Sequence, residues 1–251
     1  MSNIKVDVSD LKYQADKNFL PNKRILWKMS ESETGWVIAH NAIREEIKSM
    51  KNTLDKLILP IKKWQIECIQ KWWDGHYIHI IEHHKNEDEQ LNPFIKSRVN
   101  YPDKLETDHI ELVELLNSIS IDINNLKEND SLEGLKSKWK NYESKMLPHL
   151  REEEDIGLPL LMAYFTPKEV NKVTEKFLKD ADKRSLGSFV HWMGSKKECL
   201  KFQKYEGIPA FVWYIPTSGF KALRTHYRKT MVSMIDSLLE NKIVNSIHKN
   251  K

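Results

Sequence analysis

The sequence has few cysteines, no long apolar segment and no run of five or six like charges. Its two cysteines, Cys68 and Cys199, are too few for a disulfide framework and too far apart for a Cys-x-x-Cys redox or zinc motif. The longest apolar runs, such as residues 210–215, fall far short of the ~20 residues that span a bilayer. Because the first residues also lack an apolar signal-peptide stretch, we expect a cytoplasmic globular protein without membrane insertion.

Charge is unevenly distributed along the 251 residues, whose formal net charge is +4. From Thr166 onward there are 17 basic and 8 acidic residues, which gives this last third a net charge of +9. Basic regions can bind nucleic acid or acidic membranes. The basic residues here are scattered among acids and aromatics, so we interpret them as solvated helix faces and expect no nucleic-acid partner.

Apolar residues recur at three- and four-residue steps in four segments, which predicts four amphipathic helices over about residues 34–60, 61–98, 105–123 and 132–164. Four such helices with short connections predict an all-α fold built on an antiparallel bundle. We therefore expect an N-terminal extension over residues 1–33, a bundle over 34–165 and a helical C-terminal cap over 166–251.

Each of the four apolar stripes carries a histidine near its middle, and two of these histidines are followed four residues later by a glutamate. A spacing of four residues places both side chains on one helical face. Buried imidazoles and carboxylates on four successive helices are difficult to satisfy without a metal. The candidate ligands are His40, His83, Glu87, His109, His149 and Glu153, and such a set suits iron, manganese or zinc.

The second helix offers two registers, because His83/Glu87 and His84/Asp88 share the same spacing. On a helical wheel the apolar residues gather around Glu87, whereas Asp88 lies about 100° away toward solvent, so we favour the first register. By the same criterion Glu152 and Glu154 belong to a solvated face. His79, one turn before His83, is the best candidate for an additional ligand.

These motifs resemble the hemerythrin-like, or HHE cation-binding, domains over about residues 34–165. The resemblance rests on His40-Asn-Ala-Ile-Arg, on His83-His84-Lys-Asn-Glu87-Asp-Glu followed by Pro93-Phe94, on Asp108-His109, and on His149-Leu-Arg-Glu-Glu153-Glu-Asp followed by Leu158-Pro159-Leu160. It implies an up-down-up-down four-helix bundle that holds two non-haem irons, with Glu87 and Glu153 as bridging carboxylates and the histidines as terminal ligands. A ferritin-like site would need Glu-x-x-His on two helices, and only Glu106-Thr-Asp-His109 has this spacing.

One position departs from the oxygen-carrying hemerythrins, which have a second histidine one turn after the ligand of the third helix. Val113 stands there. Unless His79 or Glu106 replaces the missing ligand, this departure argues against reversible oxygen carriage and favours oxygen or peroxide chemistry, iron sensing or iron holding.

The C-terminal segment has helical patterns over about 167–181, 185–205 and 218–240 and many aromatic residues, among them Trp192, Phe202, Tyr205, Phe211, Trp213, Tyr214 and Phe220. We interpret it as a cap packed on the bundle; the alternative is that its aromatics wall a substrate pocket. We therefore expect a di-iron protein that binds iron and binds or reacts with dioxygen. The alternatives are a di-iron oxidase or oxygenase acting on a small molecule, and a structural metal bundle that serves as an interaction module.

Overall fold

The computed structural model describes residues 6–15, 21, 26–177 and 181–241. Throughout these ranges the regular structure is helical, and the extended pairing they contain is an isolated bridge between Gln14 and Val99. The predicted all-α class is therefore confirmed. Within the same ranges, no helix combines the length and the apolar character needed to cross a lipid bilayer.

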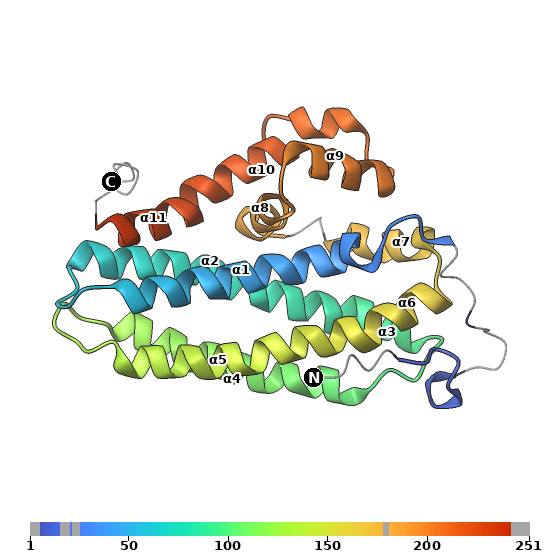
Figure 1. Ribbon diagram of the computed structural model, residues 1–251, viewed down its shortest axis with the longest axis horizontal. Helices are drawn as coiled ribbons and strands as arrows, with labels where there is room; N and C mark the ends of the chain where they lie inside the picture. Colours follow the sequence, from blue (N-terminus) through green and yellow to red (C-terminus); the bar gives the residue numbers. More distant parts are fainter. Residues whose placement is uncertain (1–5, 16–20, 22–25, 178–180, 242–251) are drawn as a thin grey trace.

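Four long helices lie alongside one another: α1 (Gly35–Lys56), α2 (Lys63–Asn86), α4 (Asp103–Asn125) and α5 (Glu133–Glu152) (Figure 1). Helix α1 packs on α5, α5 on α4, and α4 on α2. Most of their apolar residues meet in one large cluster, to which Ile43, Ile69, Leu116 and Trp139 contribute fully buried side chains. The spacing of three and four residues thus does what the sequence predicts, since it places most apolar side chains of a helix on its inner face.

Two of the long helices continue through a π-helical turn, in which a backbone amide bonds to the carbonyl five residues earlier. Helix α2 passes through η4 (Glu87–Leu91) into α3 (Asn92–Lys96), and α5 passes through η5 (Glu153–Gly157) into α6 (Leu158–Tyr164). The amides of Asn92 and Leu158 bond to the carbonyls of Glu87 and Glu153. A proline, which has no N–H to donate, follows each of them at once (Pro93 and Pro159). The chain accommodates the two prolines by widening one turn, and helix continues beyond both.

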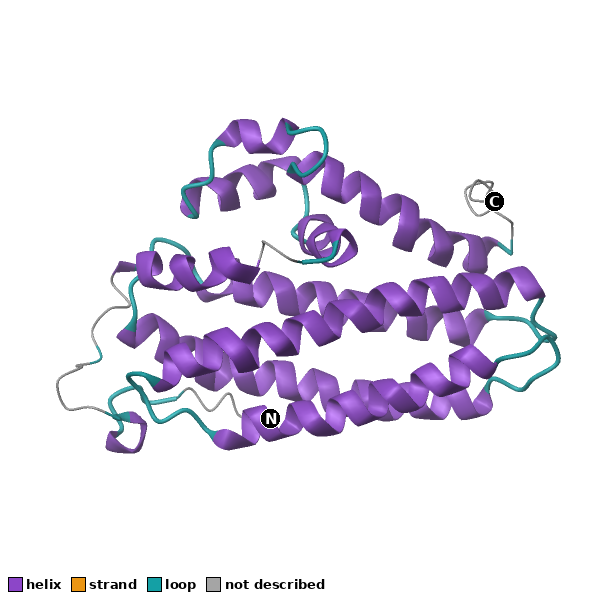
Figure 2. Ribbon diagram, turned by 180° about the vertical axis from the view of Figure 1, so that it is seen from behind, coloured by secondary structure: helices purple, strands orange, loops and turns teal. Residues whose placement is uncertain are grey.

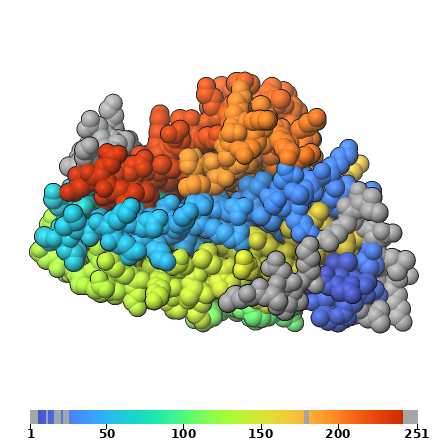
Figure 3. All heavy atoms as spheres, in the orientation of Figure 1, coloured from blue at the N-terminus to red at the C-terminus, as the bar shows by residue number. Residues whose placement is uncertain are grey.

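The C-terminal residues form a further layer of shorter helices: α7 (Pro167–Phe177), α8 (Lys183–Trp192), α9 (Lys196–Tyr205), α10 (Phe220–Tyr227) and α11 (Ser233–Glu240). The helix expected over 185–205 is broken at Gly194, whose φ of 108° suits glycine. Helix α8 crosses the long helices and packs on α1, α2 and α10 (Figures 1 and 2). In the space-filling view, orange and red atoms of this layer cover the upper flank of α1 (Figure 3).

The aromatic residues of this layer are divided between the bundle core, against which Tyr227 and Trp192 pack, and the layer itself. Trp213 lies in a small cluster with Val190, Cys199 and Leu223. Phe211 and Tyr214 are 67% and 61% exposed. These three aromatics therefore lie in the layer's own core or on its surface.

The described part of the N-terminal extension contains two short 3-10 turns, η1 (Leu11–Tyr13) and η3 (Glu31–Glu33). It packs at the end of the long helices where α6 finishes. The indole of Trp27 donates to the carbonyl of Phe165 at 3.1 Å, and the Tyr164 hydroxyl donates to the carbonyl of Val8 at 3.2 Å.

Candidate metal centre

Two adjacent clusters of metal-ligating side chains lie between the four long helices. One cluster contains His84, His109 and His149; the other contains His40, His83, Glu87 and Glu153. Within each cluster, ligand atoms from all members lie within 4.8 Å of one another. The two glutamates and four of the histidines are at most 3% exposed, and the side chain of His83 is 10% exposed. All six candidate ligands from the sequence are thus brought together, and His84 joins them.

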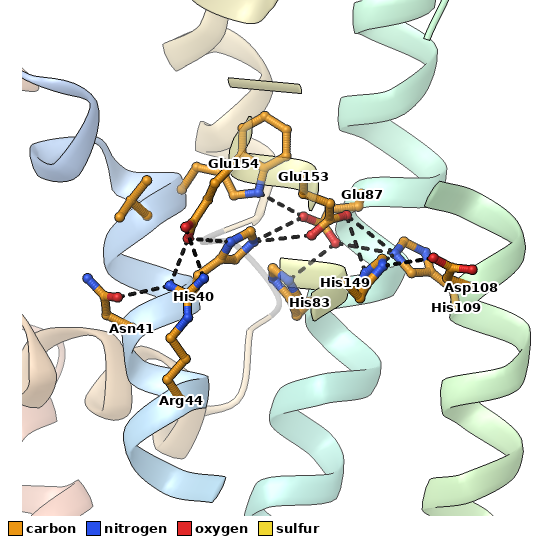
Figure 4. A network of polar contacts seen from close by, with 12 residues as sticks. His40, Asn41, Arg44, His83, Glu87, Asp108, His109, His149, Glu153 and Glu154 are labelled. Carbon is orange, nitrogen blue, oxygen red and sulfur yellow. Dashed lines mark hydrogen bonds and ion pairs between the residues drawn. The ribbon is translucent and has the colours of Figure 1, made fainter. Parts of the chain in front are cut away.

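The two carboxylates lie between the clusters (Figure 4). Glu153 places Oε2 3.4 Å from Nε2 of His40 and Oε1 3.5 Å from Nε2 of both His109 and His149. Glu87 places Oε2 3.3 Å from Nε2 of His83 and 3.7 Å from Nε2 of His109. Ligand atoms that surround one ion at about 2.1 Å lie roughly 3 Å or more apart, so these separations suit shared ions. Each glutamate therefore contacts imidazoles of both clusters.

Carboxylates behind the clusters bond to the outer ring nitrogens of two histidines, and a third carboxylate lies near that of His149. Nδ1 of His40 lies 2.9 Å from Glu154, and Nδ1 of His109 lies 2.8 Å from Asp88. Nδ1 of His149 lies 3.7 Å from a carboxylate oxygen of Asp108. When Nδ1 of His40 or His109 carries the proton for its partner, the lone pair is on Nε2, which faces Glu87 and Glu153 in both cases. This is the arrangement that orients histidine ligands of metals.

In each of the two π-helical turns, two neighbouring acidic residues contact different partners. Glu87 and Glu153 begin these turns and face the clusters. The next residue in each, Asp88 or Glu154, reaches a histidine on the adjacent long helix. Arg44 fixes the second of these acids with two bonds of 2.8 and 2.9 Å to Glu154. Each π-helical turn thus places a second carboxylate against a histidine of an adjacent helix, on α4 in the first case and on α1 in the second.

Many of the inward-facing atoms make no hydrogen bond to any described residue. They are Nε2 of His40 and His83, both ring nitrogens of His84, Oε2 of Glu87 and both carboxylate oxygens of Glu153. A buried polar atom without a partner costs about 1–3 kcal/mol, and proteins rarely leave even one. So many such atoms in one chamber form a group that could hold metal cations.

The chamber combines neutral imidazoles, which offer lone pairs, with groups that would have to release a proton to a bound cation. Burial, followed by repulsion from neighbouring imidazoles, holds the pKa of His83 and His84 well below the usual range. Both are therefore neutral at pH 7 and offer lone pairs. Burial and the nearby charge of Glu87 raise the pKa of Glu153. Burial alone would lower the pKa of His40, but Glu154, Glu87 and Glu153 outweigh it and raise that pKa to about 9.

His84 and Asp88 occupy places that the sequence interpretation did not give them. The His84 ring is 3% exposed and stacks on His109, with centroids 4.2 Å apart. The His83 ring instead meets His40 edge to face at 5.1 Å. The His83/Glu87 pair and the His84/Asp88 pair of the second helix therefore both contribute to the site. The four-residue spacing that the two pairs share was the feature of the sequence that could have indicated this. Glu154, taken from the sequence as part of a solvated face, is the partner of His40.

His79 and Glu106, the two possible replacement ligands, lie outside both clusters. Nδ1 of His79 lies 3.0 Å from the buried carboxylate of Glu46, which also pairs with Nδ1 of His76 at 2.7 Å. The same carboxylate accepts hydrogen bonds from the hydroxyls of Ser188 and Tyr227 at 2.6 and 2.8 Å. This Glu46 network ties α1 and α2 to the C-terminal layer. Glu106 is bonded to Lys96.

A cavity of about 130 Å³ reaches the His149 side of the clusters. Its walls come from α4 and α5 and include Lys104, Asp108 and Lys145 as well as His149. A volume of this size admits water or a small ligand.

The chain matches no protein-family model, no curated protein and no solved structure. What the centre does is therefore inferred from its own residues and geometry.

Proposed function

We propose that the chain is a hemerythrin-like protein that holds two non-haem irons and binds or reacts with dioxygen. The observation that carries this proposal is the position of Glu153, whose two carboxylate oxygens each face imidazoles of a different cluster. A carboxylate placed in this way could be shared by two ions. The contacts of α1 with α5, α5 with α4 and α4 with α2 agree with the up-down-up-down bundle of the hemerythrin-like family.

In this proposal His84, His109 and His149 would hold one iron, His40 and His83 would hold the other, and Glu87 and Glu153 would be shared between them. Imidazole and carboxylate donors suit iron of either oxidation state, and zinc or manganese can compete for such a set. When bound, the iron pair supplies the redox chemistry that dioxygen requires. The protein contributes fixed imidazole tautomers, through Asp88 and Glu154, and a chamber from which bulk water is excluded.

The place of His84 changes one conclusion drawn from the sequence. The absence of a histidine at Val113 argued against reversible oxygen carriage because it left one imidazole too few. His84 adds a third imidazole beside His109 and His149. The number of imidazoles therefore no longer separates reversible oxygen binding from oxidation chemistry.

The test is an optical and metal study of the purified protein. We expect two irons per chain and a visible absorption band that forms when the reduced protein meets dioxygen. A band that disappears on deoxygenation indicates reversible binding, whereas irreversible oxidation with turnover of an added substrate indicates an oxidase or oxygenase. One zinc per chain would contradict the proposal.

A matched pair of variants makes the study specific to this chamber. Glu153→Ala removes the carboxylate between the clusters and should abolish the stoichiometry of two. Asp155→Ala removes the same charge from an exposed position on the same π-helical turn and should leave the metal content unchanged. If both variants bind metal as the parent does, the iron is bound elsewhere.

A further inference from the structure

Tyr101 contributes a buried hydroxyl that has no hydrogen-bond partner among the described residues. It lies in the loop between α3 and α4 and is 5% exposed. Its ring packs in the apolar cluster that surrounds α6. A buried tyrosine hydroxyl normally finds a partner, because leaving it unpaired costs free energy. This hydroxyl therefore requires an explanation of its own.

The position of the hydroxyl is defined by Gly157, the last residue of the π-helical turn that Glu153 begins. A Cβ atom on Gly157 would lie 2.9 Å from the hydroxyl oxygen of Tyr101 and 2.7 Å from the ring of Trp36. Both contacts are too close for any residue with a side chain. The indole of Trp36 donates to Oε1 of Glu87 at 3.0 Å. Tyr101 thus approaches the metal centre where both bridging carboxylates are held.

The electrostatic surroundings keep this hydroxyl protonated. Burial raises the pKa of Tyr101 well above its usual range, and the charges of Glu153 and Glu87 raise it further. A protonated phenol is a hydrogen-bond donor. Tyr101 makes no hydrogen bond to either carboxylate, so its proton is available to a third molecule.

We propose that Tyr101 donates a hydrogen bond to a small exogenous ligand with an acceptor atom, of the size of azide or dioxygen, that enters the metal centre beside Glu87 and Glu153. The inference rests on the proposed function, because such a ligand is held there together with the metals. It goes further by assigning a recognition residue that lies outside the ligand set. Gly157 is the second component, since a larger residue would push the phenol and the indole away.

The experiment compares Tyr101→Phe with Tyr164→Phe. Tyr164 lies in the same apolar cluster and is buried, but its hydroxyl already bonds to the carbonyl of Val8. Azide is titrated into the iron-loaded parent and both variants, and its binding is followed by absorption. We expect Tyr101→Phe to bind iron normally and to raise the Kd for azide about tenfold, the effect of one hydrogen bond, while Tyr164→Phe leaves the Kd unchanged.

A second readout needs no metal. In the metal-free protein, Tyr101→Phe should melt at the same temperature as the parent or higher, because an unpaired hydroxyl has been removed. Tyr164→Phe should melt lower, because it loses a bond already made.

Each contrary result has its own meaning. An unchanged azide Kd in iron-loaded Tyr101→Phe would overturn the inference, and so would a lower melting temperature of the metal-free variant. Loss of iron from Tyr101→Phe, with loss of a visible phenolate band, would make Tyr101 a ligand instead of a donor. Failure of the proposed function is seen separately, as a parent protein that binds no iron.

Discussion

Asp88 provides a direct test of the proposed metal centre, because it lies outside the proposed ligand set and yet contacts one of the histidines in that set. Its Oδ1 lies 2.8 Å from Nδ1 of His109. Removing a carboxylate that orients a histidine ligand typically costs 10- to 100-fold in metal affinity. The Asp88 side chain is 42% exposed, so water screens part of this pairing. We therefore expect Asp88→Ala to lower the affinity about tenfold, or about 1.4 kcal/mol.

The assay is an anaerobic competition titration of iron(II) against a coloured chelator. Asp88→Asn keeps an acceptor oxygen and should lose less affinity than the alanine variant. Glu89→Ala is the matched control, since it removes the same charge from an exposed position one residue further along η4. Equal affinities for Asp88→Ala and Glu89→Ala would refute the reasoning, because the His109 ring would then not depend on its carboxylate.

Three further predictions concern the Glu46 network, the extra histidine and the metal itself. Glu46→Ala should cost about 3–5 kcal/mol of unfolding free energy in urea at pH 7, because it leaves a buried partner charge unpaired. Burial alone would raise the pKa of Glu46, but His79 and His76 hold that pKa well below 4.5. The parent protein should therefore lose stability as the pH falls below about 4.5 and Glu46 takes up a proton. Glu46→Gln should lose less stability over the same pH range. His84→Ala should lower the metal content measured by elemental analysis, whereas Val113→His should not change it; the reverse pattern would show that the third imidazole is missing after all. Removal of metal with a chelator should lower the melting temperature by roughly 5–11 °C, because metal at 100 times its Kd stabilises the folded protein by about 2.7 kcal/mol. Equal melting temperatures with and without chelator would contradict the prediction that Glu87 and Glu153 are buried together around a metal.

The helices could be predicted from the sequence because the apolar residues of each long helix recur at three- and four-residue steps. The N-terminal boundary at Thr34 was also visible, and its side chain accepts a bond from the amide of Val37. The π-helical turns were not predicted, although each has a proline six residues after its glutamate. A wheel with a fixed angle per residue cannot represent a turn that contains an extra residue.

The role of His84 could not be obtained from one helix alone. A wheel treats a helix as having one buried face, but α2 faces α1 with His83 and faces α4 and α5 with His84. Adjacent residues, about 100° apart, can therefore both be buried when neighbours lie on two sides. Asp88 and Glu154 were assigned to solvent for the same reason, since their partners are on other helices.

The most direct test of the central claim is X-ray absorption spectroscopy of the iron-loaded protein, with elemental analysis of the same sample. If Glu87 and Glu153 bridge two ions, the sample holds two irons per chain. The spectrum then shows nitrogen and oxygen neighbours together with a second iron at roughly 3–4 Å, the usual separation in two-metal sites. One iron per chain, or two irons without a metal–metal distance in this range, would contradict the account.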